Sequence, residues 1–167
     1  MESRRHGNAR LFSGATGLMC LGFVQILLGA LVAGIDAGRA FPTWPLMGDG
    51  FLPPNPLSIE PVWRNFFENA GTVQFVHRMA GYLLAVGAVI VWLRARRSGN
   101  DKTRSAFTAM LIMLGLQIVI GILTALYSAP WQIAILHQLT AVAVWVMILR
   151  ARFLARYPSM QSVRGAT

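Results

Sequence analysis

The sequence contains a single cysteine and few charged residues. Only 13% of its 167 residues are Asp, Glu, Lys or Arg, and only six of them are acidic. Because a disulfide needs two cysteines, Cys20 excludes an intramolecular one, and its place in an apolar stretch indicates a packing role. The mean hydropathy of +0.53 is too high for an ordinary soluble domain of this size. The sequence therefore predicts an integral membrane protein.

Long stretches without charge predict the number of membrane crossings. Residues 11–35 carry no charge, which is enough for one helix, since about 20 apolar residues cross a hydrocarbon core. Residues 105–149 are also uncharged, enough for two crossings, and Ser128, Ala129 and Pro130 indicate the break. We predict an all-α integral membrane fold, a four-helix bundle forming one domain over residues 1–167. The expected helices are about 11–35, 72–93, 105–126 and 132–150.

The basic residues are distributed unevenly. The formal net charge is +9, and most Lys and Arg lie before residue 11, between residues 94 and 104, or after residue 149, with Arg4, Arg5 and Arg164 among them. In a four-helix topology these segments share one side of the membrane, and the positive-inside bias makes that side cytoplasmic. Both termini are therefore predicted to be cytoplasmic, and the basic charge indicates no nucleic-acid partner.

A cleaved signal peptide is the alternative for the first apolar stretch, but that stretch is longer than a typical signal.

Two segments of the sequence resemble each other. Residues 25–33 and 117–125 share Gln, Ile, Gly, Leu and Ala at identical offsets. Each copy precedes an outer loop and then a helix with a histidine near its outer end. The chain therefore reads as two tandem helix-loop-helix repeats, related by an approximate two-fold axis along the membrane normal, with His77 and His137 facing each other. Alternatively, the glutamines only hydrogen-bond between helices and the glycines only permit close packing.

His77 and His137 are the candidate ligands. A lone histidine in an apolar stretch is usually a packed core residue, but a polar side chain at membrane depth is costly unless it lines a functional site. Two neutral imidazoles on facing helices can supply both axial ligands of a haem iron. Copper or zinc would need further ligands, and no helix offers Cys, Asp or Glu at matching depth.

The haem propionates would need donors, and cations are few on the outer side. Arg78 follows His77 directly, and Arg39 and Arg64 are the other candidates. A plain snorkelling role is the alternative for Arg78. The outer loop, about residues 36–71, is rich in proline and aromatic residues, which indicates a cap over the outer end of the bundle rather than a linker.

Five segments together resemble the haem A synthase family over nearly the whole chain. They are residues 29–41, 44–47, 65–69, 73–78 and 136–138. The resemblance implies haem A biosynthesis in a bacterial inner membrane, where the family oxidises a methyl group of haem O to a formyl group. Family members have eight transmembrane helices in two similar halves, and this chain resembles the carboxy-terminal half, associated with a bis-histidine haem b. His77 and His137 match its ligand positions.

One position separates this chain from the family's amino-terminal half. That half carries a Glu-x-x-His-Arg pattern, whereas here Gln74 stands three residues before His77, and an amide cannot ionise. The cysteine pairs that some members carry in each outer loop are also absent.

A partner is expected, either the missing amino-terminal half or a second copy. The alternatives are a non-catalytic b-type cytochrome, and a structural or transporter bundle without haem.

Overall fold

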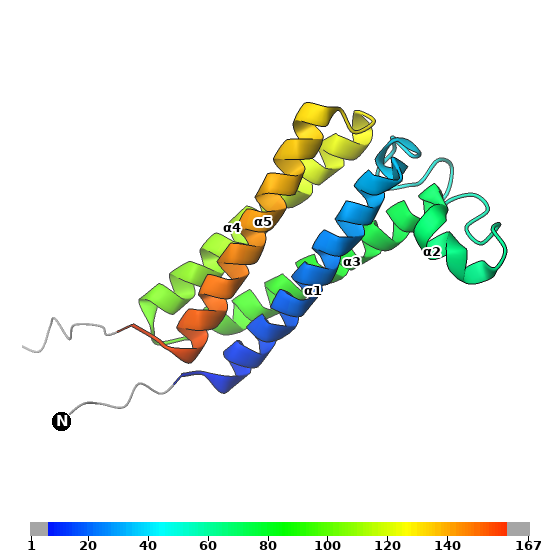
Figure 1. The fold of residues 1–167 in the computed structure, drawn as a ribbon. Helices are drawn as coiled ribbons and strands as arrows, with labels where there is room; N and C mark the ends of the chain where they lie inside the picture. The colour runs from blue at the N-terminus through cyan, green and yellow to red at the C-terminus, as the bar shows by residue number, and fades with distance from the viewer. Residues whose placement is uncertain (1–6, 160–167) are drawn as a thin grey trace, which may run out of the picture.

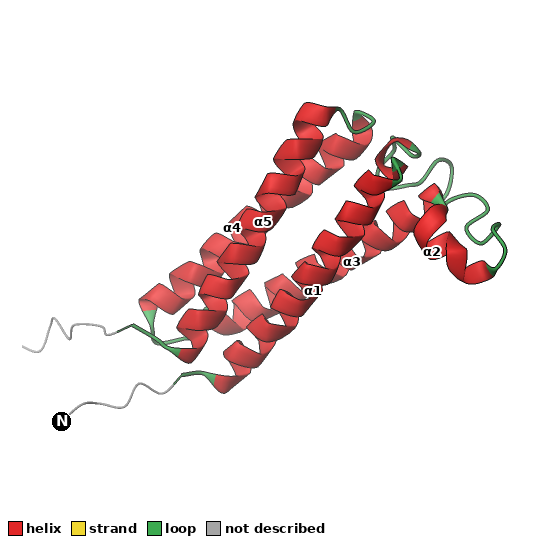
Figure 2. Cartoon of the chain, viewed as in Figure 1, coloured by secondary structure: helices red, strands yellow, loops and turns green. Residues whose placement is uncertain are grey.

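The computed structural model describes residues 7–159, so Arg4, Arg5 and Arg164 of the charge argument lie outside it. Four long helices dominate: α1 (Ala9–Gly34), α3 (Ala70–Ala95), α4 (Asp101–Leu126) and α5 (Trp131–Arg156). The segment between α1 and α3 holds two 3-10 turns, η1 (Ala37–Arg39) and η2 (Val62–Arg64), and the short helix α2 (Asn65–Glu68). Figure 2 shows that the described part of the chain is helix and loop, without strands. The predicted all-α class is confirmed.

Asparagine side chains set where three of the long helices begin. Asn8, Asn69 and Asn100 each accept a hydrogen bond from the backbone N–H three residues on, at 3.0, 3.1 and 3.0 Å. Such a cap replaces one of the backbone partners that a helix lacks in its first turn. For this reason α4 begins at Asp101, before the uncharged stretch that indicated it. The fourth long helix, α5, begins directly after Pro130, which stands at its N-cap position in an extended conformation.

The four long helices form a bundle in which each contacts two neighbours (Figure 1). Helix α1 packs against α3 and α5, and α4 packs against α5 and α3. The diagonal pairs are therefore α1 with α4 and α3 with α5. The two repeats correspond to the α1–α3 and α4–α5 units.

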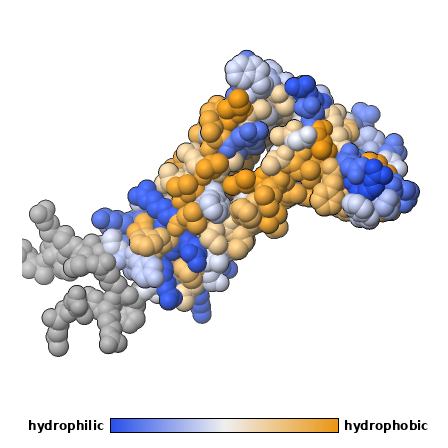
Figure 3. Space-filling model, in the orientation of Figure 1, coloured by the Kyte–Doolittle hydropathy of each residue, from blue (hydrophilic) through white to orange (hydrophobic). Residues whose placement is uncertain are grey.

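A close-packed core fills only one half of the bundle. Its buried residues are Leu11, Ala15, Leu18, Leu84, Ala88, Val91, Ala95, Ala106, Phe107, Met110, Leu114, Val144, Ile148, Ala151 and Ala155. All of them lie toward the end at which the described chain begins and ends, which we call the terminal end. Toward the opposite end, the cap end, the two units diverge (Figure 1), and Figure 3 shows an opening between them.

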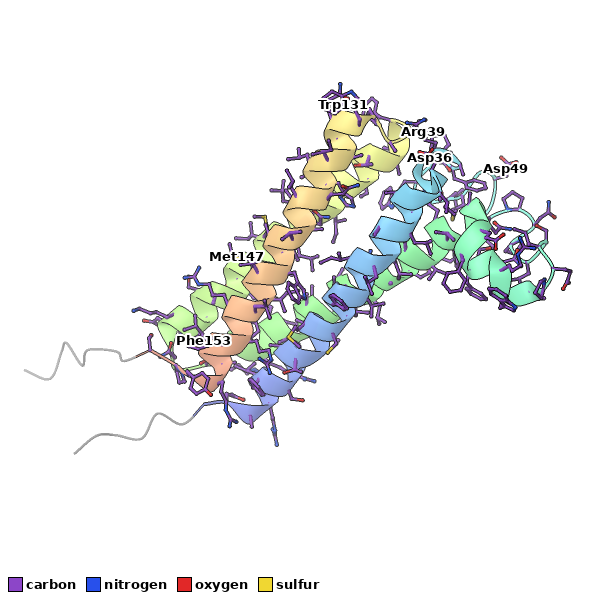
Figure 4. All side chains as sticks on the ribbon, viewed as in Figure 1. Asp36, Arg39, Asp49, Trp131, Met147 and Phe153 are labelled. Carbon is purple, nitrogen blue, oxygen red and sulfur yellow. The ribbon has the colours of Figure 1, made fainter. Side chains whose placement is uncertain are left out.

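Residues 35–69, the cap segment, lie at the cap end. Helix α2 and η1 both pack against α3, and η1 also contacts α1 and α4. A Cβ atom on Gly38 would lie 3.2 Å from the Cβ of Ala129, so η1 touches the α4–α5 turn and joins the two units beyond the opening. Figure 4 shows Asp36 and Arg39 at this end, where Trp131 begins α5.

All four long helices are long and apolar enough to span a membrane, with mean hydropathies between 1.6 and 2.4. Many of their large apolar side chains are exposed, such as Leu83 and Ile112, at 61% and 69%. Lipid tails would cover these side chains without cost. The protein is a multi-pass membrane protein.

Candidate functional site

His77 and His137 lie on the diagonal helices α3 and α5, in the half of the bundle that lacks the close-packed core. Both side chains are half-buried. His77 lies seven residues after the start of α3 and His137 six residues after the start of α5, so both lie at a similar depth from the cap end. The structure therefore places one histidine of each repeat at the same level of the bundle.

Helix α1 forms the surroundings of His77. The Nε2 of Gln25 donates to the backbone oxygen of His77 at 3.1 Å and lies 3.2 Å from its Nδ1. One turn further along α1, a Cβ on Gly29 would lie only 3.2 Å from the imidazole Cε1. Glycine at this position leaves room for the Cε1 side of the ring against α1.

Helix α4 surrounds His137 in the same way. The Nε2 of Gln117 donates to the backbone oxygen of His137 at 2.9 Å. A Cβ on Gly121 would lie 2.7 Å from the imidazole Cε1, closer than real Cβ atoms approach. The repeated Gln and Gly thus perform the same two functions in each unit: a hydrogen bond to the histidine backbone and space for its ring.

The two sites differ in the third residue after the histidine. Thr140 donates its hydroxyl to Oε1 of Gln117, whereas the equivalent residue in the first unit is Ala80. As a result, Oε1 of Gln25 is buried without a hydrogen-bond partner. The Nδ1 of His137 is also buried without a partner. Sequence reasoning missed Thr140, whose only signal is its place on the same helix face as His137.

This arrangement fits a flat ligand held from both sides. Each imidazole is fixed to its own unit through a neighbouring helix, and the packed core ends before the level of the histidines. Among residues 7–159, no group of three or more His, Cys, Asp or Glu side chains could hold a metal ion. A metal bound by side chains alone would lack ligands, whereas an iron porphyrin needs only the axial pair.

The three candidate arginines have different partners. Arg78 donates to the backbone oxygens of Phe41 and Leu46, at 3.0 and 3.1 Å, and so ties the cap segment to α3. Arg64 donates to Glu68 at 2.5 and 2.9 Å. These hydrogen bonds raise the pKa of Arg64 and hold the pKa of the exposed Glu68 carboxyl below its usual value. Arg39 lies 4.0 Å from Asp36.

Gln74, which stands where the related pattern has glutamate, is 4% exposed and lies under the cap segment. Its Nε2 is 3.5 Å from the backbone oxygens of Gly38 and Phe41, and its Oε1 has no partner. The side chain therefore faces the cap segment.

Comparison with known proteins supports the resemblance. Residues 1–149 match the COX15-CtaA family, described as cytochrome oxidase assembly protein. The chain is 61% identical to a heme A synthase of Ruegeria pomeroyi, 58% to one of Ruegeria sp. strain TM1040 and 56% to one of Paracoccus denitrificans. Each match covers 99% of this chain but 43% of the relative, so the chain spans less than half of their length. The chain belongs to the COX15-CtaA family.

Proposed function

We propose that this chain is the haem b-binding half of a haem A synthase, with His77 and His137 as the axial ligands of the iron. The observation that carries the proposal is that two imidazoles, one from each unit, lie at a similar depth on diagonal helices, in the half of the bundle without the close-packed core. The high identity of the chain to heme A synthases supports it.

The side chains of this chain would bind and orient the group. A haem held by two imidazoles exchanges single electrons with other redox groups. Gln25 and Gln117 would fix the helix turns that carry the ligands, through hydrogen bonds to the histidine backbones. Gly29 and Gly121 would leave space for the imidazole rings. Arg78 would donate hydrogen bonds to a haem propionate. A guanidinium has five N–H donors, and the two backbone oxygens use only part of them.

The oxidation of the haem O methyl group would depend on a second half. Gln74 supplies no carboxylate, and its amide faces the cap segment. The partner would be the amino-terminal half of the relatives, since this chain covers 43% of their length, or a second copy of this chain. The protein would lie in the bacterial inner membrane with both termini in the cytoplasm.

The experiment is expression in cells that make haem O but lack their own haem A synthase, followed by mass identification of the haem in the purified protein. We expect haem b with a low-spin spectrum and no haem A. Haem A in these cells would show a complete enzyme and overturn the assignment as a half. A colourless protein with intact helices would overturn haem binding.

The alternative of a non-catalytic b-type cytochrome is not favoured, because the relatives at 56% identity and above are heme A synthases. Co-expression with the amino-terminal half of such a relative separates the two functions. Haem A formed only when both parts are present would support the proposal, and its absence from assembled complexes would favour the cytochrome.

A further inference from the structure

Two arginines of α5 converge on one aromatic ring of α1 at the terminal end. The guanidinium carbon of Arg152 lies 4.3 Å from the ring centroid of Phe12, and that of Arg156, one turn further along α5, lies 5.4 Å from it. Nε of Arg152 donates to the hydroxyl of Thr16 at 2.9 Å, and that hydroxyl donates to the backbone oxygen of Phe12. Helix α1 therefore holds the guanidinium of Arg152 through a ring contact and a hydrogen bond.

Within residues 7–159, neither of these two arginines forms an ion pair. The ion pairs of that part of the chain involve Arg39, Arg64 and Arg104. Asp101, the one acidic residue at the terminal end of the described chain, pairs with Arg104. Nε is also the only nitrogen of the Arg152 guanidinium that has a hydrogen bond to a described residue. Two like charges gathered on one ring repel each other, and a bound anion would relieve that repulsion.

The depth of Arg152 matches the phosphate level of a lipid bilayer. Trp131, which is 68% exposed, begins α5 at the cap end, and Arg152 follows it by 21 residues. At 1.5 Å per residue this distance is roughly 30 Å, the thickness of a hydrocarbon core. Tryptophan favours a membrane–water interface, which places Arg152 at the opposite interface, where phospholipid phosphates lie.

An exposed apolar face of α5 lies beside the arginines. Phe153, which follows Arg152 in the sequence (Figure 4), forms a ring pair with Tyr157 at a centroid distance of 5.2 Å, and both side chains are more than half exposed. Val146 and Val142, also exposed, continue this face from Phe153 toward the middle of α5, at the seven- and four-residue intervals of one helix face. A free phosphate ion would use only the arginines, whereas a phospholipid would use both surfaces.

We propose that Arg152, Arg156 and Phe12 form a binding site for the phosphate of an anionic phospholipid, whose acyl chain lies along the exposed face of α5. The guanidiniums donate to the phosphate oxygens, which their planar N–H forks match. Phe12 and Thr16 keep Arg152 in position before the lipid binds. Two positive charges favour a headgroup with a net negative charge over a zwitterionic one.

The test is a titration of the purified full chain in detergent with phosphatidylglycerol or phosphatidylcholine, read by native mass spectrometry. Arg152→Gln combined with Arg156→Gln should weaken phosphatidylglycerol binding about tenfold and change phosphatidylcholine binding little. The control combines Arg94→Gln with Arg97→Gln, which removes the same charge from exposed arginines at the same end and should weaken binding less than about twofold.

Arg156→Gln alone keeps the test independent of folding, because Arg156 is exposed, and it should weaken phosphatidylglycerol binding severalfold. Equal losses in the two double variants would show a general charge effect and overturn the site, as would unchanged binding in Arg156→Gln and in its double variant. Inorganic phosphate separates the two sources of the anion. If it displaces the phospholipid more than chloride of the same ionic strength does, the site binds a free ion and the lipid is wrong.

Discussion

At the scale of single residues, the site depends on how closely two glycines approach two imidazoles. The distance from an added Cβ to the ring Cε1 would be 3.2 Å at Gly29 and 2.7 Å at Gly121. The second distance requires a shift of the ring or of the helix, and the first requires only a few tenths of an ångström. The second ligand is therefore the more sensitive of the two to a small change in its neighbour.

We expect Gly121→Ala to weaken haem ligation more than Gly29→Ala. Overpacking costs about 1–3 kcal/mol, while alanine gains about 1 kcal/mol of helix propensity at either position. Because the gain in helix propensity is the same at both positions, the difference in haem ligation between the two variants reports the contact with the imidazole alone. The measurement is the low-spin fraction after titration with haem b. A larger loss in Gly29→Ala would contradict the geometry of the two sites.

The histidines could be identified from the sequence, because imidazoles are rare and costly in apolar helices. The sequence indicated Gln25 and Gln117 as part of the repeat, with a hydrogen bond between helices as the alternative account, and the structure shows such a bond in each unit. Thr140 could not be identified. A threonine in an apolar helix usually donates to a carbonyl of its own helix, and Oγ1 of Thr140 lies 2.8 Å from the carbonyl oxygen of Leu136. Its contact with Gln117 depends on the packing of α4 against α5.

At the scale of elements, the cap segment is held by buried polar contacts more than by its exposed ion pairs. Asn65 is fully buried, accepts from Ile59 N at 3.0 Å, and donates to the oxygens of Ile59 and Val62 at 2.8 and 2.9 Å. Arg64 and Glu68, in contrast, are exposed, and solvent weakens such pairs. The sequence indicated an ordered cap from its prolines and aromatics, but four residues of α2 are too few for a helical pattern.

We expect Asn65→Ala to loosen the cap segment by about 2–3 kcal/mol, since each lost hydrogen bond is worth about 1 kcal/mol. Amide hydrogen exchange across residues 57–69 measures this. The control, Glu68→Gln, should have little effect at neutral pH. Comparable exchange rates in both variants would show that the cap does not depend on Asn65.

The Arg64–Glu68 pair also has a defined pH dependence. The hydrogen bonds from Arg64 lower the pKa of Glu68 in the folded protein. The pair therefore gives its full stabilisation of the fold at pH values above the usual carboxyl pKa. That contribution is lost as the pH falls through the lowered value. Protection factors of the cap amides, which correct for the intrinsic slowing of exchange in acid, should fall slightly on acidification in the unaltered chain and less in Glu68→Gln. An equal fall in both would assign the acid sensitivity to another group.

At the scale of the whole molecule, the bundle separates its close-packed core from the candidate site. The packed core lies at the terminal end, whereas the histidines lie where the α1–α3 and α4–α5 units diverge. The repeat predicted this pairing of helices. The divergence could not be predicted, because it depends on packing between helices of different units rather than on the pattern within any one helix.

Phe107, which is fully buried in the core, tests this separation. It precedes Gln117 on α4 by roughly 15 Å, at 1.5 Å per residue. In soluble cores a Phe→Ala change costs about 3–5 kcal/mol of stability. We expect Phe107→Ala to cost less, because in a membrane the unpacked side chain is surrounded by lipid rather than water. The low-spin spectrum at low temperature should not change. Loss of that spectrum together with stability would show that core and site are one unit.

The central claim is that His77 and His137 hold one haem between the two units. The measurement is the electron paramagnetic resonance spectrum of the purified chain loaded with haem b, compared with those of His77→Ala and His137→Ala. The account predicts a low-spin bis-imidazole signal in the unaltered chain and its loss in each variant, with membrane insertion intact. A low-spin signal that persists in either variant would remove that histidine as a ligand and contradict the account.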